Sequence, residues 1–175
     1  MADEPTIREA HVDDARAIGT LHVRSWRAAY RGILPDALLD GLSMEEWIER
    51  RRKALIEPLW EGVRNWVVEE GGRIRGWAAM GPSRDEDLAR GAQELMAIYL
   101  PPDDVGKGYG RRLMEHCIAA AIEQGSSEMT MWVLAGNERA QRFYAKAGFE
   151  ADPRVSAEDF RDTGALKLRM WRTLP

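Results

Sequence analysis

The chain has 175 residues, of which 45% are hydrophobic and 31% are charged, and its formal net charge is −4. These values predict a single domain over residues 1–175 with a substantial hydrophobic core. The net charge argues against a general nucleic-acid-binding protein, which needs clustered lysine and arginine to neutralise phosphates, and the single cysteine, Cys117, excludes a disulfide framework or a cysteine-rich zinc site.

The N-terminal segment is acidic and lacks the apolar stretch of a signal peptide, and no run approaches the length of a membrane span. We therefore expect a cytoplasmic protein that does not associate with membranes. Thr6–Arg8 is predicted to form a short strand. Asp13 is the predicted N-cap of a helix that runs to about Tyr30, because small or apolar residues recur on one face of it: Ala15, Ile18, Leu21, Ser25 and Ala29.

Two more helices are predicted in the first half of the chain. Pro35 suits the first turn of a short helix that ends near Gly41. Ser43 and Glu46 form a capping box at the start of a longer helix, whose apolar positions are Trp47, Ile48, Leu55 and Ile56.

The second half of the chain is richer in strands. Residues 65–69 and 73–80 are predicted strands joined by a Glu70-Gly71-Gly72 hairpin turn. A third strand, 94–100, stops at two prolines, and the remaining elements are a helix over 108–123, a strand over 128–134, a helix over 137–147 and a strand over 165–171. This order predicts a mixed α/β sheet with helices on both faces.

The sharpest local signal is the glycine-rich sequence Val105-Gly106-Lys107-Gly108-Tyr109-Gly110, which follows a predicted strand and opens a predicted helix. Glycines let the backbone approach a ligand closely, and the free amides of a helix N-terminus attract anions. Lys107, Arg111 and Arg112 add positive charge. The loop is therefore predicted to bind a pyrophosphate.

Other phosphate-binding loops fit less well. A P-loop needs lysine and serine or threonine after its second glycine, and these are absent. A dinucleotide-binding fingerprint needs G-x-G-x-x-G and an acidic residue at the end of the next strand, whereas this chain has G-x-G-x-G and Glu128 at the start of that strand. A glycine turn without a ligand is disfavoured by three alternating glycines backed by three cations.

Two blocks of the sequence resemble the GNAT superfamily of N-acetyltransferases. Residues 94–101 (ELMAIYLP) followed by 106–113 (GKGYGRRL) are similar to its central strand and coenzyme A loop, and 137–149 (NERAQRFYAKAGF) is similar to its N-x-x-A-x-x-F-Y-x-x-x-G-F segment. The resemblance is specific over about residues 91–149. One departure is Val105, where the family usually has glutamine or arginine.

The resemblance implies a mixed, largely antiparallel sheet of about six to seven strands, splayed apart where coenzyme A binds, with helices on both faces. Pantetheine would pair with the central strand as an extra strand would. Acetyl-CoA would be the co-substrate, with no metal. The implied cofactor contacts are Ile98, Tyr99, Leu100, Val105, Gly106, Lys107, Gly108, Tyr109, Gly110, Arg111 and Asn137. Asn137 is also the predicted N-cap of the helix that follows it.

Acetyl transfer to an amine requires a neutral amine and a leaving thiolate. Deprotonating a lysine-like amine of pKa about 10.4 costs about 4.6 kcal/mol at pH 7, so a base is useful. Glu94 is the candidate base; an ordinary strand-end glutamate in solvent or in a salt bridge is the alternative. The resemblance places Tyr144 beside the sulfur as a hydrogen-bond donor; a core aromatic next to Phe143 is the alternative.

The sequence predicts the acceptor site less clearly than the cofactor site. The resemblance implies that Trp26 and Tyr30 wall it, although packing of the first helix on the sheet explains them equally well. The acidic residues Asp85, Glu86 and Asp87 and the loop 156–162 are candidates for attracting a cationic acceptor, or are simply solvated. His11, His22 and His116 have no metal-ligand spacing, and core or surface roles are expected for them.

The sequence thus predicts an acetyl-CoA-dependent N-acetyltransferase that works by direct transfer to a small-molecule amine. The alternative is a catalytically silent acyl-CoA-binding sensor or partner module of the same fold. The resemblance makes a homodimer one assembly to expect, and the sequence does not fix the oligomeric state.

Overall fold

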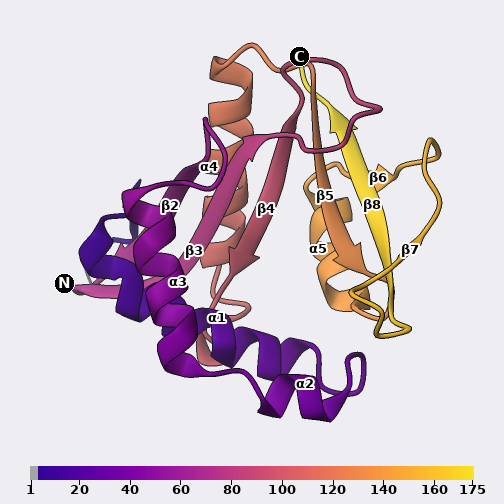
Figure 1. Cartoon of the computed structure of the whole chain (residues 1–175). Helices are drawn as coiled ribbons and strands as arrows, with labels where there is room; N and C mark the ends of the chain where they lie inside the picture. The colour runs from indigo at the N-terminus through magenta and orange to yellow at the C-terminus, as the bar shows by residue number, and fades with distance from the viewer. Residues whose placement is uncertain (1–3) are drawn as a thin grey trace.

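A computed structural model describes residues 4–175, and its strands all belong to one sheet (Figure 1). The strand order is β1-β2-β3-β4-β5-β8-β6, with β7 also paired to β8. The strands are β1 (Thr6–Glu9), β2 (Arg64–Glu70), β3 (Arg73–Pro82), β4 (Gln93–Tyr99), β5 (Glu128–Leu134), β6 (Glu150–Ala151), β7 (Glu158–Asp159) and β8 (Leu166–Thr173).

All neighbouring strands are antiparallel except β4 and β5, which are parallel. The predicted mixed, largely antiparallel sheet is confirmed, with two short strands, β6 and β7, in addition to those read from the sequence. Each of these has two residues, too few to show an alternating pattern.

Five α-helices accompany the sheet within the described residues: α1 (Ala15–Ala29), α2 (Asp36–Asp40), α3 (Met44–Ile56), α4 (Tyr109–Glu123) and α5 (Glu138–Lys146). Two predicted caps are confirmed: the Ser43 hydroxyl accepts a hydrogen bond from the Glu46 amide (3.3 Å), and the Asn137 side chain accepts one from the Ala140 amide (3.1 Å). The hairpin turn between β2 and β3 is also confirmed.

The predicted N-cap at Asp13 is wrong. Residues Val12–Asp14 form a 3₁₀ turn, η1, and α1 begins only at Ala15. The Asp14 carboxylate accepts hydrogen bonds from the His11 amide (2.7 Å) and from Arg8 (2.7 Å). The acidic residue that organises this helix start is therefore Asp14, and it joins α1 to β1.

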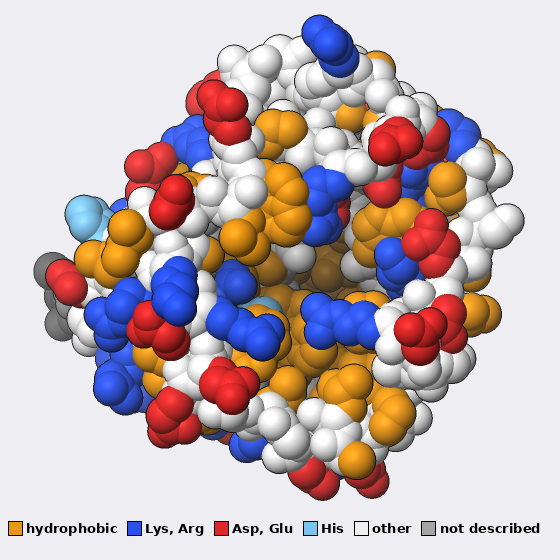
Figure 2. Space-filling view, viewed as in Figure 1, with side chains coloured by type: hydrophobic (Ala, Val, Ile, Leu, Met, Phe, Trp, Pro, Cys, Tyr) orange, Lys and Arg blue, Asp and Glu red, His pale blue; other side chains and the backbone are white. Residues whose placement is uncertain are grey.

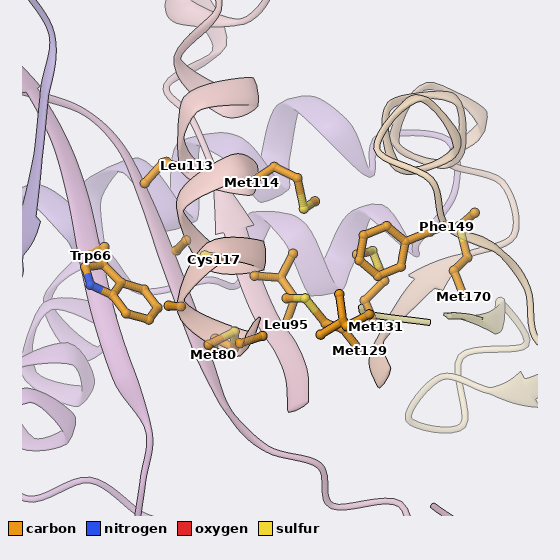
Figure 3. Close-up of a cluster of buried hydrophobic side chains, with 14 of the residues drawn as sticks. Trp66, Met80, Leu95, Leu113, Met114, Cys117, Met129, Met131, Phe149 and Met170 are labelled. Carbon is orange, nitrogen blue, oxygen red and sulfur yellow. The ribbon is translucent and has the colours of Figure 1, made fainter. Parts of the chain in front are cut away.

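Helices cover both faces of the sheet, as predicted. Alternate residues of β2 and β3 point to opposite sides: Val67, Trp77 and Ala79 pack against Ile18 and Leu21 of α1, on the side that also carries α3. The other side packs against α4 and α5 (Figure 1), and its sulfur-rich core is drawn in Figure 3. That core includes Trp66, Met80, Leu95, Leu113, Met114, Cys117, Met129, Met131, Phe149 and Met170.

The sheet is split between its two parallel strands. β4 and β5 pair only at Gln93–Met129 and Glu94–Thr130. Beyond these pairs β4 carries a β-bulge, because Ala79 pairs with Ala97 but Met80 pairs with Leu95, which leaves Met96 as an extra residue. The strands then diverge (Figure 1), and we call the gap between them the wedge.

Candidate active site

The wedge exposes one half of the central strand. Gln93, Glu94 and Leu95 are buried where β5 pairs with β4, whereas residues 96–100 are half-buried. The side chains of Ile98 and Leu100 pack towards α4, and the Leu100 carbonyl accepts a hydrogen bond from the Ser25 hydroxyl of α1. The wedge therefore leaves strand backbone of residues 96–100 without a neighbouring strand on this side, and pairing with an extended group such as pantetheine stays a prediction.

The glycine loop lies between β4 and α4, and its backbone is available to a ligand. Gly106 and Gly108 have φ values of +88° and +93°, which favour glycine, and no other atom lies within 4 Å of the position that a Cβ would take at either residue. Among residues 4–175, no backbone carbonyl accepts from the amides of Gly106, Lys107 or Gly108. The first-turn amides of α4 are also free of intrahelical bonds. This arrangement fits a diphosphate.

Gly110 serves a different purpose from the other two loop glycines. A Cβ at Gly110 would lie 3.1 Å from a methyl group of Leu100 and 3.5 Å from the Phe143 ring. Glycine here allows α4 to pack closely on β4 and α5.

The positive charge predicted at the loop is largely neutralised. The Lys107 ammonium pairs with the buried Asp104 carboxylate (3.0 Å), and Arg111 pairs with Glu115 (2.7 Å). The Tyr109 hydroxyl donates to Glu70 (2.6 Å), so its side chain ties the loop to the β2–β3 hairpin. Of the predicted cations only Arg112 forms no ion pair with a described residue. Attraction for an anion therefore rests mainly on the amides and the helix dipole.

Tyr144 lies on α5, at the opposite side of the wedge from β4. It is half-buried and packs edge-on against Phe143, with ring centroids 5.4 Å apart. Burial raises the pKa of the Tyr144 phenol, and the nearby Tyr99 raises it further. The phenol therefore stays protonated near neutral pH and can donate a hydrogen bond.

Glu94 forms the salt bridge that was one of the two predicted alternatives. Its side chain is only 3% exposed, and its two oxygens accept from Arg84 at 3.0 and 2.5 Å. The Arg84 guanidinium also stacks over the Trp60 ring at 5.0 Å. Neither oxygen of Glu94 can bind an amine directly without weakening this ion pair.

A cavity of about 480 Å³ lies on the α1 side of the sheet, next to the wedge. The predicted acceptor residues Trp26 and Tyr30 line it, and the Tyr30 hydroxyl lies 3.4 Å from that of Tyr99. The Tyr99 side chain thus belongs to this cavity, so only its main chain faces the wedge. Figure 2 shows the hollow, with hydrophobic side chains deep inside and basic side chains at its mouth.

Sequence reasoning missed much of this cavity. Five of the seven tryptophans line it, together with residues from the β7–β8 segment, although nothing in the sequence links them. His22 stacks on Trp47 with centroids 4.2 Å apart, and the Arg51 guanidinium lies 5.0 Å from the centre of the Trp77 ring. Burial, followed by the charges of Arg51 and Arg161, lowers the pKa of His22 to about 3, so it is neutral and a poor proton acceptor. Trp60, Trp132 and Lys167 were also missed, whereas Phe160 and Arg161 lie in the loop 156–162 that the sequence had indicated as a candidate at the acceptor site.

Several carboxylates of the acidic segments proposed to attract a cationic acceptor are held by other contacts. Arg169 of β8 is 1% exposed and pairs with Asp87 (2.5 Å) and Asp85 (3.3 Å). In the loop 156–162, Glu158 pairs with Lys167 (2.9 Å) and Asp159 accepts from the Gly164 amide (2.9 Å). These carboxylates hold the β3–β4 loop and the β7–β8 segment in place.

Within residues 4–175, no helix is both long and apolar enough to cross a bilayer, and no group of three or more histidine, cysteine or acidic side chains is placed to hold a metal. Cys117 is fully buried, and burial raises the pKa of its thiol to about 12, so it is unsuited to act as a nucleophile.

The sequence and the fold both match a known class of enzyme. Residues 17–149 match the sequence profile of the Acetyltransferase (GNAT) family. The uncharacterized N-acetyltransferase YuaI of Bacillus subtilis is 29% identical over 94% of this chain and 88% of its own length. The L-amino acid N-acyltransferase MnaT of Escherichia coli is 30% identical over 82% of this chain and 78% of its own length.

A solved structure shows the same fold. The protein yncA of Salmonella typhimurium, solved with its cofactor acetyl-CoA, superimposes with a TM-score of 0.72 at 23% identity, covering 98% of this chain and 95% of that one. The chain belongs to the GNAT family of acetyltransferases. It is an N-acetyltransferase.

Proposed function

We propose that this enzyme transfers the acetyl group of acetyl-CoA, bound in the wedge, directly to the amine of a small molecule bound in the cavity. The observation that carries the proposal is the split between β4 and β5, which has free loop amides at one end and an open cavity of about 480 Å³ on the α1 side. A cavity of this size suits a small ligand. The similarity to MnaT, named as an L-amino acid N-acyltransferase, supports the same class of acceptor.

The cofactor would be held mainly by backbone. Acetyl-CoA supplies the activated acetyl thioester. The amides from Gly106 to Arg111 would bind its diphosphate, with Val105 shaping the start of the loop, and the main chain of Ile98, Tyr99 and Leu100 would pair with the pantetheine arm. The amide nitrogen of the Asn137 side chain is not used by the cap and would serve the same arm.

Tyr144 would stabilise the departing sulfur by donating a hydrogen bond to it. A phenol whose pKa is raised by burial gives up its proton reluctantly, so the donation counts more than complete proton transfer. On the other side, the proton of the amine would leave through water towards Glu94, whose carboxylate lines the cavity. The Arg84 ion pair would fix the orientation of that carboxylate.

The experiment is an acceptor screen with acetyl-CoA, read by thiol release and by mass spectrometry for an acetyl gain on the amine. Acetylation of small amines, faster than hydrolysis of acetyl-CoA, is the expected result. Tight binding of coenzyme A without turnover of any amine would instead support the silent sensor, and acetylation of protein lysines alone would overturn the small-molecule acceptor.

A further inference from the structure

The cavity contains buried hydrogen-bonding groups that the chain itself does not satisfy. These are both ring nitrogens of His22, the indole nitrogen of Trp26 and Nε of Arg51, and all three residues line the cavity. Buried polar groups in folded proteins nearly always have partners. Arg51, Trp26 and one nitrogen of the neutral His22 are N–H donors. These atoms are themselves buried, so they make this end of the cavity polar without facing a ligand, and the direct donors to a ligand are the terminal nitrogens of the half-buried Arg51.

The charges of the cavity also favour an anionic ligand. Its lining carries four cations, Arg51, Arg84, Arg161 and Lys167, against two carboxylates, Glu94 and Asp159. Arg84 and Lys167 are paired with Glu94 and Glu158, whereas no described carboxylate lies within ion-pair distance of Arg51 or Arg161. Arg51 is only half-exposed. Burial leaves the charge of its guanidinium poorly solvated, and this lowers its pKa. An anion beside Arg51 would compensate that charge.

The unpaired charge of Arg51 lies at the end of the cavity that is formed by Trp47 and Trp77. The Arg51 guanidinium lies 5.7 Å from the centre of Trp47 and 5.0 Å from that of Trp77, and the His22 ring lies 4.2 and 5.7 Å from the same two rings. Flat aromatic walls hold a guanidinium while leaving its edge free for a carboxylate. The Tyr99 ring, 4.8 Å from His22, separates this end from the Tyr30 hydroxyl.

We propose that Arg51, at the end of the cavity lined by His22 and Trp26, binds an anionic group of the acceptor, so that the substrate is an amine that also carries a carboxylate or a phosphonate. The inference rests on the proposed function, because it takes the cavity as the acceptor site. The anionic group lies against Trp47 and Trp77, and the amine points past Tyr99 towards the wedge. In the transfer a C–N bond forms, the thioester C–S bond breaks and the amine loses a proton, while the anionic group is unchanged.

The first test compares matched acceptors. Each amino acid or aminoalkylphosphonate is assayed beside its uncharged amide or ester and beside the amine that lacks the anionic group. We expect the wild-type kcat/KM to be at least about 10-fold higher for the anionic member of each set that is turned over. Arg51→Gln should reduce that value about 10- to 100-fold, Arg51→Lys should reduce it less, and uncharged acceptors should change by less than about threefold.

Arg50→Gln is the matched control. The Arg50 guanidinium also lies over Trp47, at 5.2 Å, but it does not line the cavity. This variant should keep the wild-type preference. If uncharged amines are acetylated equally well by the wild type and by Arg51→Gln, and anionic acceptors are not favoured, the inference is overturned while the proposed function stands.

A second test needs no turnover. Binding of N-acetylated amino acids, the expected products, is compared with binding of their uncharged amides through quenching of tryptophan fluorescence. Selective binding of the acids that Arg51→Gln loses would support the anion site even if no amine were acetylated. Equal binding of acids and amides, or equal loss of both in Arg51→Gln, would overturn it.

Discussion

The two sides of the split sheet are built in different ways. The side proposed to bind the cofactor depends on backbone groups. These are the part of β4 that does not pair with β5, two glycines with positive φ, and the first turn of α4. The side proposed to bind the acceptor depends on side chains that α1, α3, the four strands β2 to β5 and the β7–β8 segment bring into one cavity. Backbone sites constrain local sequence strongly, whereas side-chain cavities can change their lining without changing the fold. This difference explains why the sequence predicts the cofactor but does not predict the acceptor.

The largest expected effect is a loss of coenzyme A binding, caused by a change in the glycine loop alone. Gly108→Val places a branched side chain at φ +93°, in the space where the diphosphate would lie. We expect affinity for coenzyme A, measured by calorimetry, to fall at least about 100-fold, because several charge-assisted hydrogen bonds are lost together.

Gly91→Val is the matched control, because Gly91 has the same φ of +93° and equally open surroundings but lies in the β3–β4 loop. Both variants carry similar backbone strain, so both should lose a similar amount of thermal stability. Undiminished coenzyme A binding in Gly108→Val would contradict the role of the loop.

The next effect concerns the junction of the two sides, at Tyr144. Tyr144→Phe removes one hydroxyl and keeps the aromatic packing against Phe143. We expect kcat to fall about 100-fold with little change in coenzyme A affinity, as is typical when a donor to developing charge is lost. Steady-state kinetics with an accepted amine measures this, and an unchanged kcat would remove Tyr144 from the mechanism.

A smaller effect should separate two roles of Glu94. If Glu94 receives the amine's proton through water, Glu94→Gln should lower kcat about 10- to 100-fold, at or below the lower end of the about 100- to 10,000-fold that a directly acting general base contributes. Arg84→Gln, which leaves the carboxylate in place but unpaired, should cost several-fold less. Equal losses in the two variants would show that Glu94 matters only through its ion pair with Arg84.

The last expected effect is on the pH dependence of stability, and it is the smallest at neutral pH because it appears only as the pH falls. The native protein binds a proton at His22 only below about pH 3, whereas the unfolded chain does so below about pH 6.5. The contribution of His22 to stability is therefore complete above about pH 6.5 and is lost as the pH falls from there towards 3, with a slope of up to ~1.4 kcal/mol per pH unit.

Urea titrations at several pH values test this, with His22→Gln as the variant. The wild type should lose stability more steeply than His22→Gln below about pH 6.5, and His11→Gln, which changes an exposed histidine, is the control. Parallel curves for the wild type and His22→Gln would show that His22 is not desolvated by the cavity.

The fold was largely predictable because its signals are local. Hydrophobic periodicity gave the long helices and strands, Ser43 and Asn137 marked two helix starts, and two glycines marked the hairpin turn. The 3₁₀ turn before α1 was missed because Asp13 and Asp14 are adjacent and only the contacts of Asp14 with Arg8 and the His11 amide distinguish them.

The candidate site was predictable on one side only. The glycine loop shows in the sequence, but the pairing of Lys107 with Asp104 and of Arg111 with Glu115 does not, so the charge of the loop was overestimated. Trp47 and Arg51 lie one helical turn apart on α3, yet no pattern says that they meet His22 of α1 and Trp77 of β3. Only two aromatic side chains of this cavity, Trp26 and Tyr30, were singled out from the sequence.

The central claim is that backbone amides of the glycine loop bind the cofactor and side chains of the cavity bind the acceptor. NMR on ¹⁵N-labelled wild-type protein tests it most directly. Coenzyme A should shift the backbone amides of residues 106–111 and leave the indole signals of Trp47 and Trp77 nearly unchanged, and an N-acetylated amino acid should do the reverse. Coenzyme A that moved the indole signals while the loop amides stayed in place would contradict the account.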